Sequence, residues 1–235
     1  MELIKNRILY QSEVCIVINK LKGEAAQAAK AAQGTKESIS NLPKELAKLL
    51  NIKRDLIQPA HRIDVPVTGC VLFALTKQTQ VFLYNAFADK KNNPIKKKYW
   101  AIVEKPDVMP AQNAQIVHWI ETNVKINKSF VYDTESKNRK KAVLNYKIIA
   151  EGTNYLFLEV ELFSGRHHQI RAQLAAIGLF IKGDVKYGAR RGEKEGGIRL
   201  HARYLSFPDP LNPNEKITIT ADPPQIDNLW KEFLK

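Results

Sequence analysis

The chain has 235 residues, of which 44% are hydrophobic and 26% are charged, as is ordinary for a soluble globular protein with a sizeable core. Its net charge of +13 favours a polyanionic partner, and a nucleic acid is favoured over a membrane surface. The alternative is a basic surface that contacts only solvent. Cys15 and Cys70, each in an apolar segment, give no basis for a disulfide framework or a cysteine zinc site, and no apolar run approaches the ~18 residues of a membrane span. These features predict a cytoplasmic protein.

The amino-terminal part begins with two short β-type runs within residues 8–19, separated by a polar turn. Residues 22–40 are rich in Ala, Lys, Gln and Gly, and they predict either a short helix or a loop. Residues 42–50 predict a helix, because the proline at position 43 is permitted in a first turn.

The stretch HRIDVPVTGCVLFAL, residues 61–75, places a carboxylate before an apolar strand. Residues 71–75 are continuously apolar, which is typical of a strand covered on both faces, and Pro66 with Gly69 marks the preceding loop. Asp64 therefore lies on a loop that a rigid scaffold positions. From these residues alone, Asp64 is either a turn residue or a catalytic one.

A helix is predicted for residues 77–89, and a strand for residues 96–103. In that strand Tyr99 shares a face with alternate apolar residues, so it is either a core aromatic or an active-site residue. The lysines at 96–98 are either a solvated charge run or phosphate contacts.

The next segment, residues 111–132, has only scattered β-type character. Residues 136–142 are strongly basic and predict a hairpin loop that is either solvated or in contact with an RNA backbone. Strands are predicted for residues 143–150 and 155–163, the second with the alternation of a half-buried sheet.

The second strand leads into SGRHHQIR, residues 164–171, and a helical pattern follows. Arg166, His167 and His168 are expected in the first helical turn, where the helix dipole disfavours cations. An anion, either a phosphate or a fixed carboxylate, would explain this placement, and a solvated basic turn is the alternative.

The carboxyl-terminal part begins with a turn-rich segment at residues 181–188, in which Asp184 is a rival carboxylate, interpreted as a turn residue. Residues 190–197 predict a Gly-rich basic surface loop without the order of a phosphate-binding loop. A strand is expected for residues 199–207, and a terminal helix within residues 223–235.

Several motifs occur together in order: HRID with its P-V-T-G turn, KKYWAIV, SGRHHQIRAQLAAIG, GDVKYG and IRLHARYLSFPDP. From about Ile8 to the carboxyl end, this arrangement resembles the RluA-type RNA pseudouridine synthases. The resemblance implies an α+β fold with a bent, mostly antiparallel mixed sheet and flanking helices around a central RNA-binding cleft. We expect residues 1–235 to form one catalytic domain, or two closely joined lobes. Because few residues precede Ile8, we expect it to bind RNA without the amino-terminal module of larger members.

The resemblance implies that the chain isomerises uridine to pseudouridine in RNA, with Asp64, Tyr99 and Arg166 as catalytic residues. Asp64 must be ionised to act, either as a nucleophile or as a base that removes a ribose proton. Arg166 would pair with this carboxylate, and Tyr99 would stack on the uracil. Nothing is oxidised or hydrolysed, so neither a cofactor nor a metal is expected.

The partner that the resemblance implies is ribosomal or transfer RNA, with no membrane and no obligatory protein partner. The target base must flip out of its stack, which costs a few kcal/mol, and Arg62 would fill the vacated position. A salt bridge to a surface acid is the alternative for Arg62, and a packed, hydrogen-bonded histidine is the alternative for His61. The residues expected at the substrate or RNA are Arg62, Leu200, His61, His167, Gln169 and Lys98.

Three positions depart from the family pattern. Leu21 stands where a proline is usual, which bears on the rigidity of the NKLKG loop. Val65 stands where many members have arginine and Val67 where many have threonine, so the loop after Asp64 is less polar.

Two other classes of function remain open. A catalytically silent RNA-binding protein would share the charge but would have no need of all three catalytic matches. A phosphodiester-cleaving enzyme would also be basic, yet the sequence offers neither paired metal-binding carboxylates nor a convincing pair of acid and base histidines.

Overall fold

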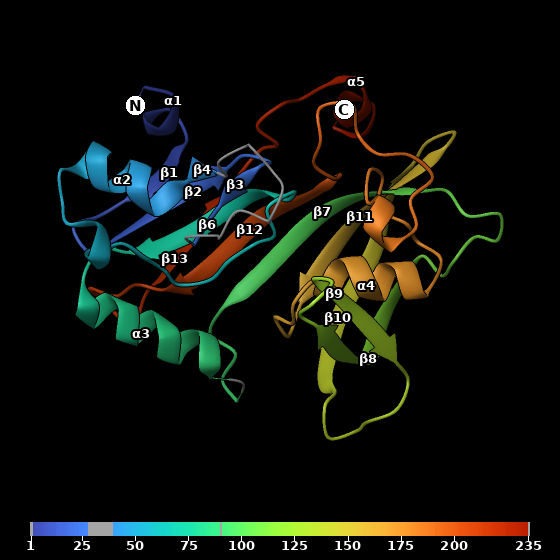
Figure 1. The fold of residues 1–235 in the computed structure, drawn as a ribbon, viewed down its shortest axis with the longest axis horizontal. Coiled ribbons are helices and arrows are strands. Elements are labelled where there is room, and N and C mark those ends of the chain that lie inside the picture. The colour runs from blue at the N-terminus through green and yellow to red at the C-terminus, as the bar shows by residue number, and fades with distance from the viewer. Residues whose placement is uncertain (1, 28–39, 90, 235) are drawn as a thin grey trace. The chain divides into compact units, whose positions relative to one another are not determined.

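The computed structural model describes residues 2–27, 40–89 and 91–234 (Figure 1). Residues 28–39, which hold most of the segment predicted as a helix or a loop, lie outside the described residues. The chain divides into two compact units. Unit 1 comprises Met1–Lys96 and Ala202–Pro224, and unit 2 comprises Lys97–His201 and Gln225–Lys235.

The sheet of unit 1 contains most of the buried apolar strands of the amino-terminal half. Its strands, in spatial order, are β1 (Ile8–Gln11), β2 (Cys15–Lys20), β6 (Thr68–Ala74) and β12 (Leu200–Pro208), whose first two residues belong to unit 2. β5 (Gln58–Pro59) pairs with β6, and β13 (Lys216–Thr220) pairs with β12. These two pairs are antiparallel, as are β1 with β2 and β2 with β6. A separate parallel pair joins β3 (Glu24–Ala25) to β4 (Ser40–Asn41).

Helices cover both faces of this sheet, with α2 (Leu42–Leu50) and α3 (Lys77–Ala88) on opposite sides (Figure 1). The side chain of Asn41 caps α2, and that of Thr76 caps α3. Leu83 of α3 packs into a core cluster that includes apolar residues of β2, β6 and β12. The two predicted helices are therefore confirmed. The unit also contains the short helices α1 (Glu2–Lys5) and η1 (Arg54–Leu56).

Unit 2 is built on an antiparallel sheet. Its strands, in spatial order, are β7 (Lys96–Glu104), β11 (Tyr155–Leu162), β10 (Lys140–Glu151), β8 (Asn113–Asn123) and β9 (Lys128–Tyr132). The scattered β character of residues 111–132 thus corresponds to two complete strands. The predicted hairpin at residues 136–142 is wrong, because β9 and β10 both pair with β8, on opposite sides of it.

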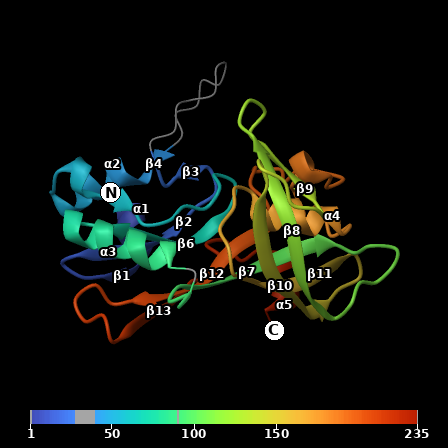
Figure 2. The ribbon, with the colours of Figure 1, turned by 90° about the horizontal axis from the view of Figure 1, so that it is seen from below.

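The two faces of this sheet have different covers. The helix α4 (Gln169–Ala176) lies against β8 and β9, and the amide of its Gln173 donates to backbone carbonyls of β8 and β10 (Figure 2). The helix α5 (Asn228–Phe233) places Trp230 against Ile102 of β7 and Phe157 of β11. The 3-10 helix η2 (Val185–Tyr187) follows the end of α4.

The predicted fold class, α+β with mostly antiparallel strands and flanking helices, is confirmed. A single catalytic domain and a central RNA-binding cleft remain predictions. Among the residues described, no helix combines the length and the apolar character needed to cross a membrane.

Gly69 of β6 occupies a position that requires glycine on two grounds. Its φ of +115° lies in a region that L-residues rarely adopt. A Cβ at this position would also collide with the backbone of Ala202 in β12. Residue type here therefore determines how closely β6 and β12 approach within unit 1.

We expect Gly69→Ala to lower the free energy of unfolding by more than Gly23→Ala does. Gly23 also has a positive φ, +82°, but a Cβ added there would meet no atom within 4 Å, so its substitution adds only backbone strain of about 1–2 kcal/mol. Urea denaturation of both variants measures the difference. Equal losses would show that the contact with Ala202 imposes no constraint.

Candidate functional site

Asp64 lies half-buried on the loop between β5 and β6, in unit 1. Two buried apolar side chains, Ile63 and Val67, anchor the loop on either side of it. The N–H of Val67 donates to the carbonyl of Asp64 at 3.0 Å, which closes a turn. Val67, which stands where many family members have threonine, is only 2% exposed. This difference therefore affects packing and not the surface of the loop.

Lys20, at the end of β2, lies beneath this loop with an exposed fraction of 0%. Its Nζ donates to the carbonyls of Leu21 at 2.8 Å, Glu24 at 2.9 Å and Val65 at 3.1 Å. Burial lowers the pKa of Lys20 to about 7, against the opposing influence of the Glu24 and Asp64 carboxylates. The bond to Val65 fixes the backbone next to Asp64. Sequence reasoning missed Lys20, because a lysine that ends a strand usually reaches solvent.

The NKLKG loop is held by hydrogen bonds in the absence of the usual proline. The N–H of Leu21 donates to Oε2 of Glu24 at 2.7 Å. Arg7 binds the same carboxylate with both Nη groups, at 2.8 and 2.9 Å. These hydrogen bonds hold the loop in place although Leu21 replaces the proline.

His61 and Arg62 differ in their surroundings. Nε2 of His61 accepts a hydrogen bond from the N–H of Leu72 at 3.3 Å, and its ring stacks on Phe87 with centroids 5.2 Å apart. His61 is thus packed and hydrogen-bonded, which agrees with the alternative to an RNA contact for this residue. Arg62 is exposed and donates to the side chain of Gln27 at 3.1 Å.

The prediction that Arg166, His167 and His168 occupy the first turn of a helix is wrong. α4 begins only at Gln169, and His168 has a left-handed backbone with φ 53°. The turn before α4 is instead organised around Gln169, which is 3% exposed. Its Oε1 accepts from the N–H of Arg166 at 3.0 Å and from the hydroxyl of Ser164 at 2.9 Å. Its Nε2 donates to a carbonyl of β10, that of Val143, at 3.1 Å.

Arg166 is half-buried, and its Nε donates to the carbonyl of Lys141 in β10 at 3.0 Å. Tyr99 of β7 is 7% exposed and lies opposite Val160 of β11, shortly before β11 ends. A Cβ on Gly165 would lie 3.5 Å from Nζ of Lys97. Tyr99 and the Arg166 turn therefore lie at the same end of the unit 2 sheet.

Leu200 and Lys98 also belong to unit 2. Leu200 is buried, and the carbonyl of the preceding Arg199 accepts from the N–H of Ile102 in β7 at 3.0 Å. Lys98 projects from the face of β7 opposite to that of Tyr99, and its Nζ forms an ion pair with Glu159 at 2.9 Å. Lys98 and Tyr99 are thus not brought together on one face.

The two histidines of the turn bind groups within the protein. Nδ1 of His167 lies 3.0 Å from the hydroxyl of Ser129, and its Nε2 lies 3.1 Å from Oδ1 of Asn127. His168 is buried, which lowers its pKa to about 2, and its Nδ1 lies 2.9 Å from the hydroxyl of Tyr187. Contacts of His167 and Gln169 with a phosphate remain a prediction.

Asp184, the rival carboxylate, has a structural environment. It is 2% exposed, and it binds Arg171 of α4 through two hydrogen bonds of 2.6 and 2.8 Å. This pair ties η2 to α4, in agreement with the interpretation of Asp184 as a turn residue. Among the residues that the structure describes, no group of three or more His, Cys, Asp or Glu side chains is placed to hold a metal ion.

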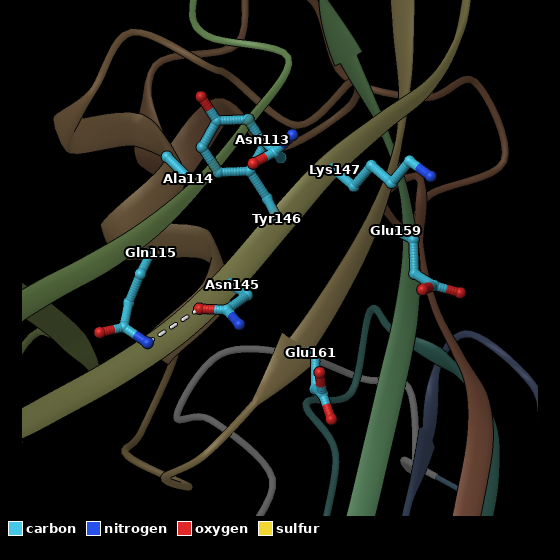
Figure 3. Close-up of a pocket in the computed structure, with 8 residues that line it drawn as sticks. All are labelled: Asn113, Ala114, Gln115, Asn145, Tyr146, Lys147, Glu159 and Glu161. Atoms are coloured by element: carbon cyan, nitrogen blue, oxygen red, sulfur yellow. Dashed lines mark hydrogen bonds between the residues drawn. The ribbon is translucent and has the colours of Figure 1, made fainter.

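A hollow of about 330 Å³ lies over β8, β10 and β11 (Figure 3). Its lining is mostly amide and carboxylate side chains and contains none of the predicted site residues. Glu159 is paired with Lys98, and the charges of Glu161 and Lys147 are opposite, so the lining has no excess of positive charge that would attract a nucleic-acid backbone. The residues lining it are Asn113, Ala114, Gln115, Asn145, Tyr146, Lys147, Glu159 and Glu161.

The site residues thus form two groups. Asp64 lies with Lys20 and Arg62 in unit 1, and Tyr99 lies with Arg166 and Leu200 in unit 2. Within each group, buried contacts fix the loops that carry the polar side chains. The pairing of Asp64 with Arg166 remains a prediction.

Comparison with known proteins finds RNA pseudouridine synthases among the similar sequences and structures. The sequence pattern of the family described as RNA pseudouridylate synthase matches residues 14–176. A ribosomal large subunit pseudouridine synthase C of Rickettsia conorii is 32% identical over 185 residues, which are 77% of this chain and 56% of that protein. An uncharacterized RNA pseudouridine synthase of Bacillus subtilis is 27% identical over 231 residues, which are 95% of this chain and 73% of that protein. This chain thus spans little more than half of the first relative.

Solved structures show the same fold. Human RNA pseudouridylate synthase domain containing 4 superposes with a TM-score of 0.74 at 21% identity, covering 99% of this chain and 93% of that one. Human RNA pseudouridylate synthase domain containing 1 gives a TM-score of 0.72 at 21% identity, covering 92% and 83%.

We expect Lys20→Met to lower the free energy of unfolding by about 2 kcal/mol. The substitution leaves the buried carbonyls of Leu21, Glu24 and Val65 without their donor, and removing the burial cost of an ammonium group offsets only part of that loss. Urea denaturation measures the change, with the exposed Lys77→Met as the matched control. A loss of less than about 0.5 kcal/mol would mean that the three hydrogen bonds do not hold the loop.

Proposed function

Because this chain belongs to the RNA pseudouridylate synthase family, we propose that it isomerises uridine to pseudouridine within RNA. The members of this family are isomerases that act on RNA. In the proposed reaction the bond from the ribose C1′ to uracil N1 breaks, the base turns, a bond from C1′ to C5 forms, C5 loses its proton and N1 gains one. The observation that carries this proposal is Asp64, a half-buried carboxylate on a loop that Lys20 and two apolar neighbours hold in place.

Asp64 is the catalytic carboxylate of this proposal. It acts either by attacking the substrate covalently or by taking a proton from the ribose. Its support is positional, because the loop is fixed on both sides and rests on the buried strand β6. A group held within a small range of positions can approach the reacting atom without ordering cost.

Arg166 and Tyr99 complete the proposed catalytic set. The Nε of Arg166 is bound to the carbonyl of Lys141, so its Nη groups are the ones that would meet the Asp64 carboxylate. Tyr99 would stack on the uracil, with Leu200 as an apolar wall beside β7. A nearby guanidinium favours the ionised form of a carboxylate, and we assign to Arg166 the role of keeping Asp64 ionised in this way.

The target uridine must leave its base stack before it can react. Arg62, exposed and two residues from Asp64, is the side chain that we assign to the vacated position. The net charge of +13 favours the RNA backbone and helps to offset the few kcal/mol that unstacking costs.

The substrate class that we propose is structured ribosomal or transfer RNA. One relative is named a ribosomal large subunit pseudouridine synthase, and the basic surface suits either kind of RNA. The proposed isomerisation transfers no electrons, so it requires no redox cofactor. The two buried free cysteines fit a reducing compartment, and we place the reaction in the cytoplasm.

We expect Asp64→Asn to abolish pseudouridine formation while RNA binding persists. The amide keeps the shape of the side chain but can neither attack C1′ nor remove a proton. Release of tritium from RNA labelled at uridine C5 measures the reaction, and fluorescence anisotropy of labelled RNA measures binding.

The matched control is Asp55→Asn, which changes an exposed carboxylate of η1 in the same unit and should leave the rate unchanged. Tritium release by the Asp64→Asn protein at the parent rate would remove Asp64 from the mechanism. Binding without tritium release by the parent protein would instead identify a catalytically silent RNA-binding protein.

A further inference from the structure

One face of the ribbon formed by β9, β8 and β10 carries a row of aromatic and basic side chains. Tyr132 of β9 lies opposite Trp119 of β8, and Trp119 lies opposite Lys141 of β10. Directly opposed residues of antiparallel strands project from the same face. The three side chains therefore form a continuous row across the ribbon. Phe130, two residues before Tyr132, shares this face and is 39% exposed.

This face is not the one that α4 covers. The amide of Gln173 in α4 reaches the carbonyls of Ile116 and Ala142 from the other side, where alternate residues of β8 and β10 are buried. The α5 helix packs on Trp100 and Phe157 of the two strands farthest from β9. Trp119 and Tyr132 thus remain half-exposed in unit 2.

Cations accompany the aromatic rings. The guanidinium of Arg139 lies 3.5 Å from the centre of the Tyr132 ring, within the range of a cation–π contact. Lys141 is exposed. From Trp119 to Lys141 the chain has six basic and three acidic residues, so a negatively charged ligand is favoured here.

The row ends at the backbone that holds Arg166. The carbonyl of Lys141 accepts the hydrogen bond from Nε of Arg166 at 3.0 Å. The side chain of Trp119, opposite Lys141, is therefore near the turn that carries a proposed catalytic residue. The row lies on the face of the sheet opposite to that of Tyr99, so nucleotides next to a target uridine at Arg166 would reach it around the strand ends that carry the Arg166 turn.

We propose that Tyr132, Trp119 and Lys141 form a subsite for unpaired nucleotides beside the target uridine. Bases stack on Trp119 and on the Arg139–Tyr132 pair, and a phosphate binds Lys141. Every base has a π-face, so such stacking tolerates sequence, but those faces are hidden in a duplex. The subsite rests on the proposed function and specifies its substrate as RNA that is unpaired next to the target.

Cross-strand packing alone does not account for the row. An aromatic pair stabilises a ribbon without needing the exposed Lys141 beside it, whereas Arg139 is half-buried and lies 3.8 Å from the carboxylate of Glu121 on the same face. The same face also carries the hollow of Figure 3, where Glu159 is paired with Lys98 and Glu161 adds a negative charge. A phosphate is therefore assigned to Lys141, at the β10 end of the row.

The test uses the full chain carrying Asp64→Asn, so that RNA is bound but not converted. Unpaired RNA of about 12 nucleotides, and a duplex of the same sequence, are titrated while tryptophan emission is recorded. We expect the unpaired RNA to quench emission, and Trp119→Phe to remove that quench. Trp100 and Trp230 pack against each other within unit 2 and should not respond. No quench, or an equal quench by the duplex, would overturn the proposal.

Affinity is measured separately by anisotropy of labelled unpaired RNA. Loss of one stacked base corresponds to about 10-fold weaker binding, so we expect that change for Trp119→Ala and a change within about 3-fold for Trp119→Phe. Tyr84→Ala, which removes a 70% exposed aromatic side chain from α3, should leave affinity unchanged. An affinity of Trp119→Ala within about 2-fold of that of the parent would overturn the proposal.

Steady-state kinetics of tritium release distinguish a failure of the subsite proposal from a failure of the proposed function. With the catalytic carboxylate present, Trp119→Ala should raise KM for C5-tritiated RNA and leave kcat unchanged. Tritium release with an unaltered KM would overturn the subsite and leave the isomerase intact. Quenching and weakened binding without any tritium release would support the subsite and overturn the isomerase.

Discussion

The buried ammonium of Lys20 is the contact on which the arrangement of the candidate catalytic loop depends. Burying an amine is costly and lowers the pKa of Lys20, and the group is retained with three carbonyl partners around it. One of those carbonyls belongs to Val65, the residue after Asp64. Because Lys20 itself ends a mostly buried strand, the loop is tied directly to the sheet of unit 1. The Asp64 carboxylate can then remain half-exposed without being mobile.

In unit 2 the loop that carries Arg166 is held by a buried amide, where unit 1 has a buried ammonium. The carboxamide of Gln169 links the N–H of Arg166, the hydroxyl of Ser164 and a carbonyl of β10, and a second carbonyl of β10 receives the guanidinium. In both units a buried polar side chain satisfies the backbone where an apolar strand ends, and the next exposed side chain is positioned as a result. His167, on the same turn, contacts the hydroxyl of Ser129 and the side chain of Asn127.

Much of the fold could be predicted from sequence, because local signals agreed with tertiary structure. A proline permitted in a first turn predicted α2, and continuous apolar residues predicted β6. The start of α4 could not be predicted. Ser164 is of a type that often caps helices, but its hydroxyl bonds instead to the side chain of Gln169 and to the backbone of β10. The burial of Lys20 was equally hidden, since its partners come from two separate loops. β8 escaped recognition because apolar residues occur on both of its faces, which obscures the alternation.

The central claim is that this fixed carboxylate isomerises uridine in RNA, and mapping pseudouridines in RNA from cells with and without the gene tests it most directly. The account predicts that one or more uridines lose their modification when the gene is deleted. The parent chain should restore those pseudouridines, and a chain with asparagine at position 64 should not. Identical maps with and without the gene, or restoration by the asparagine chain, would contradict it.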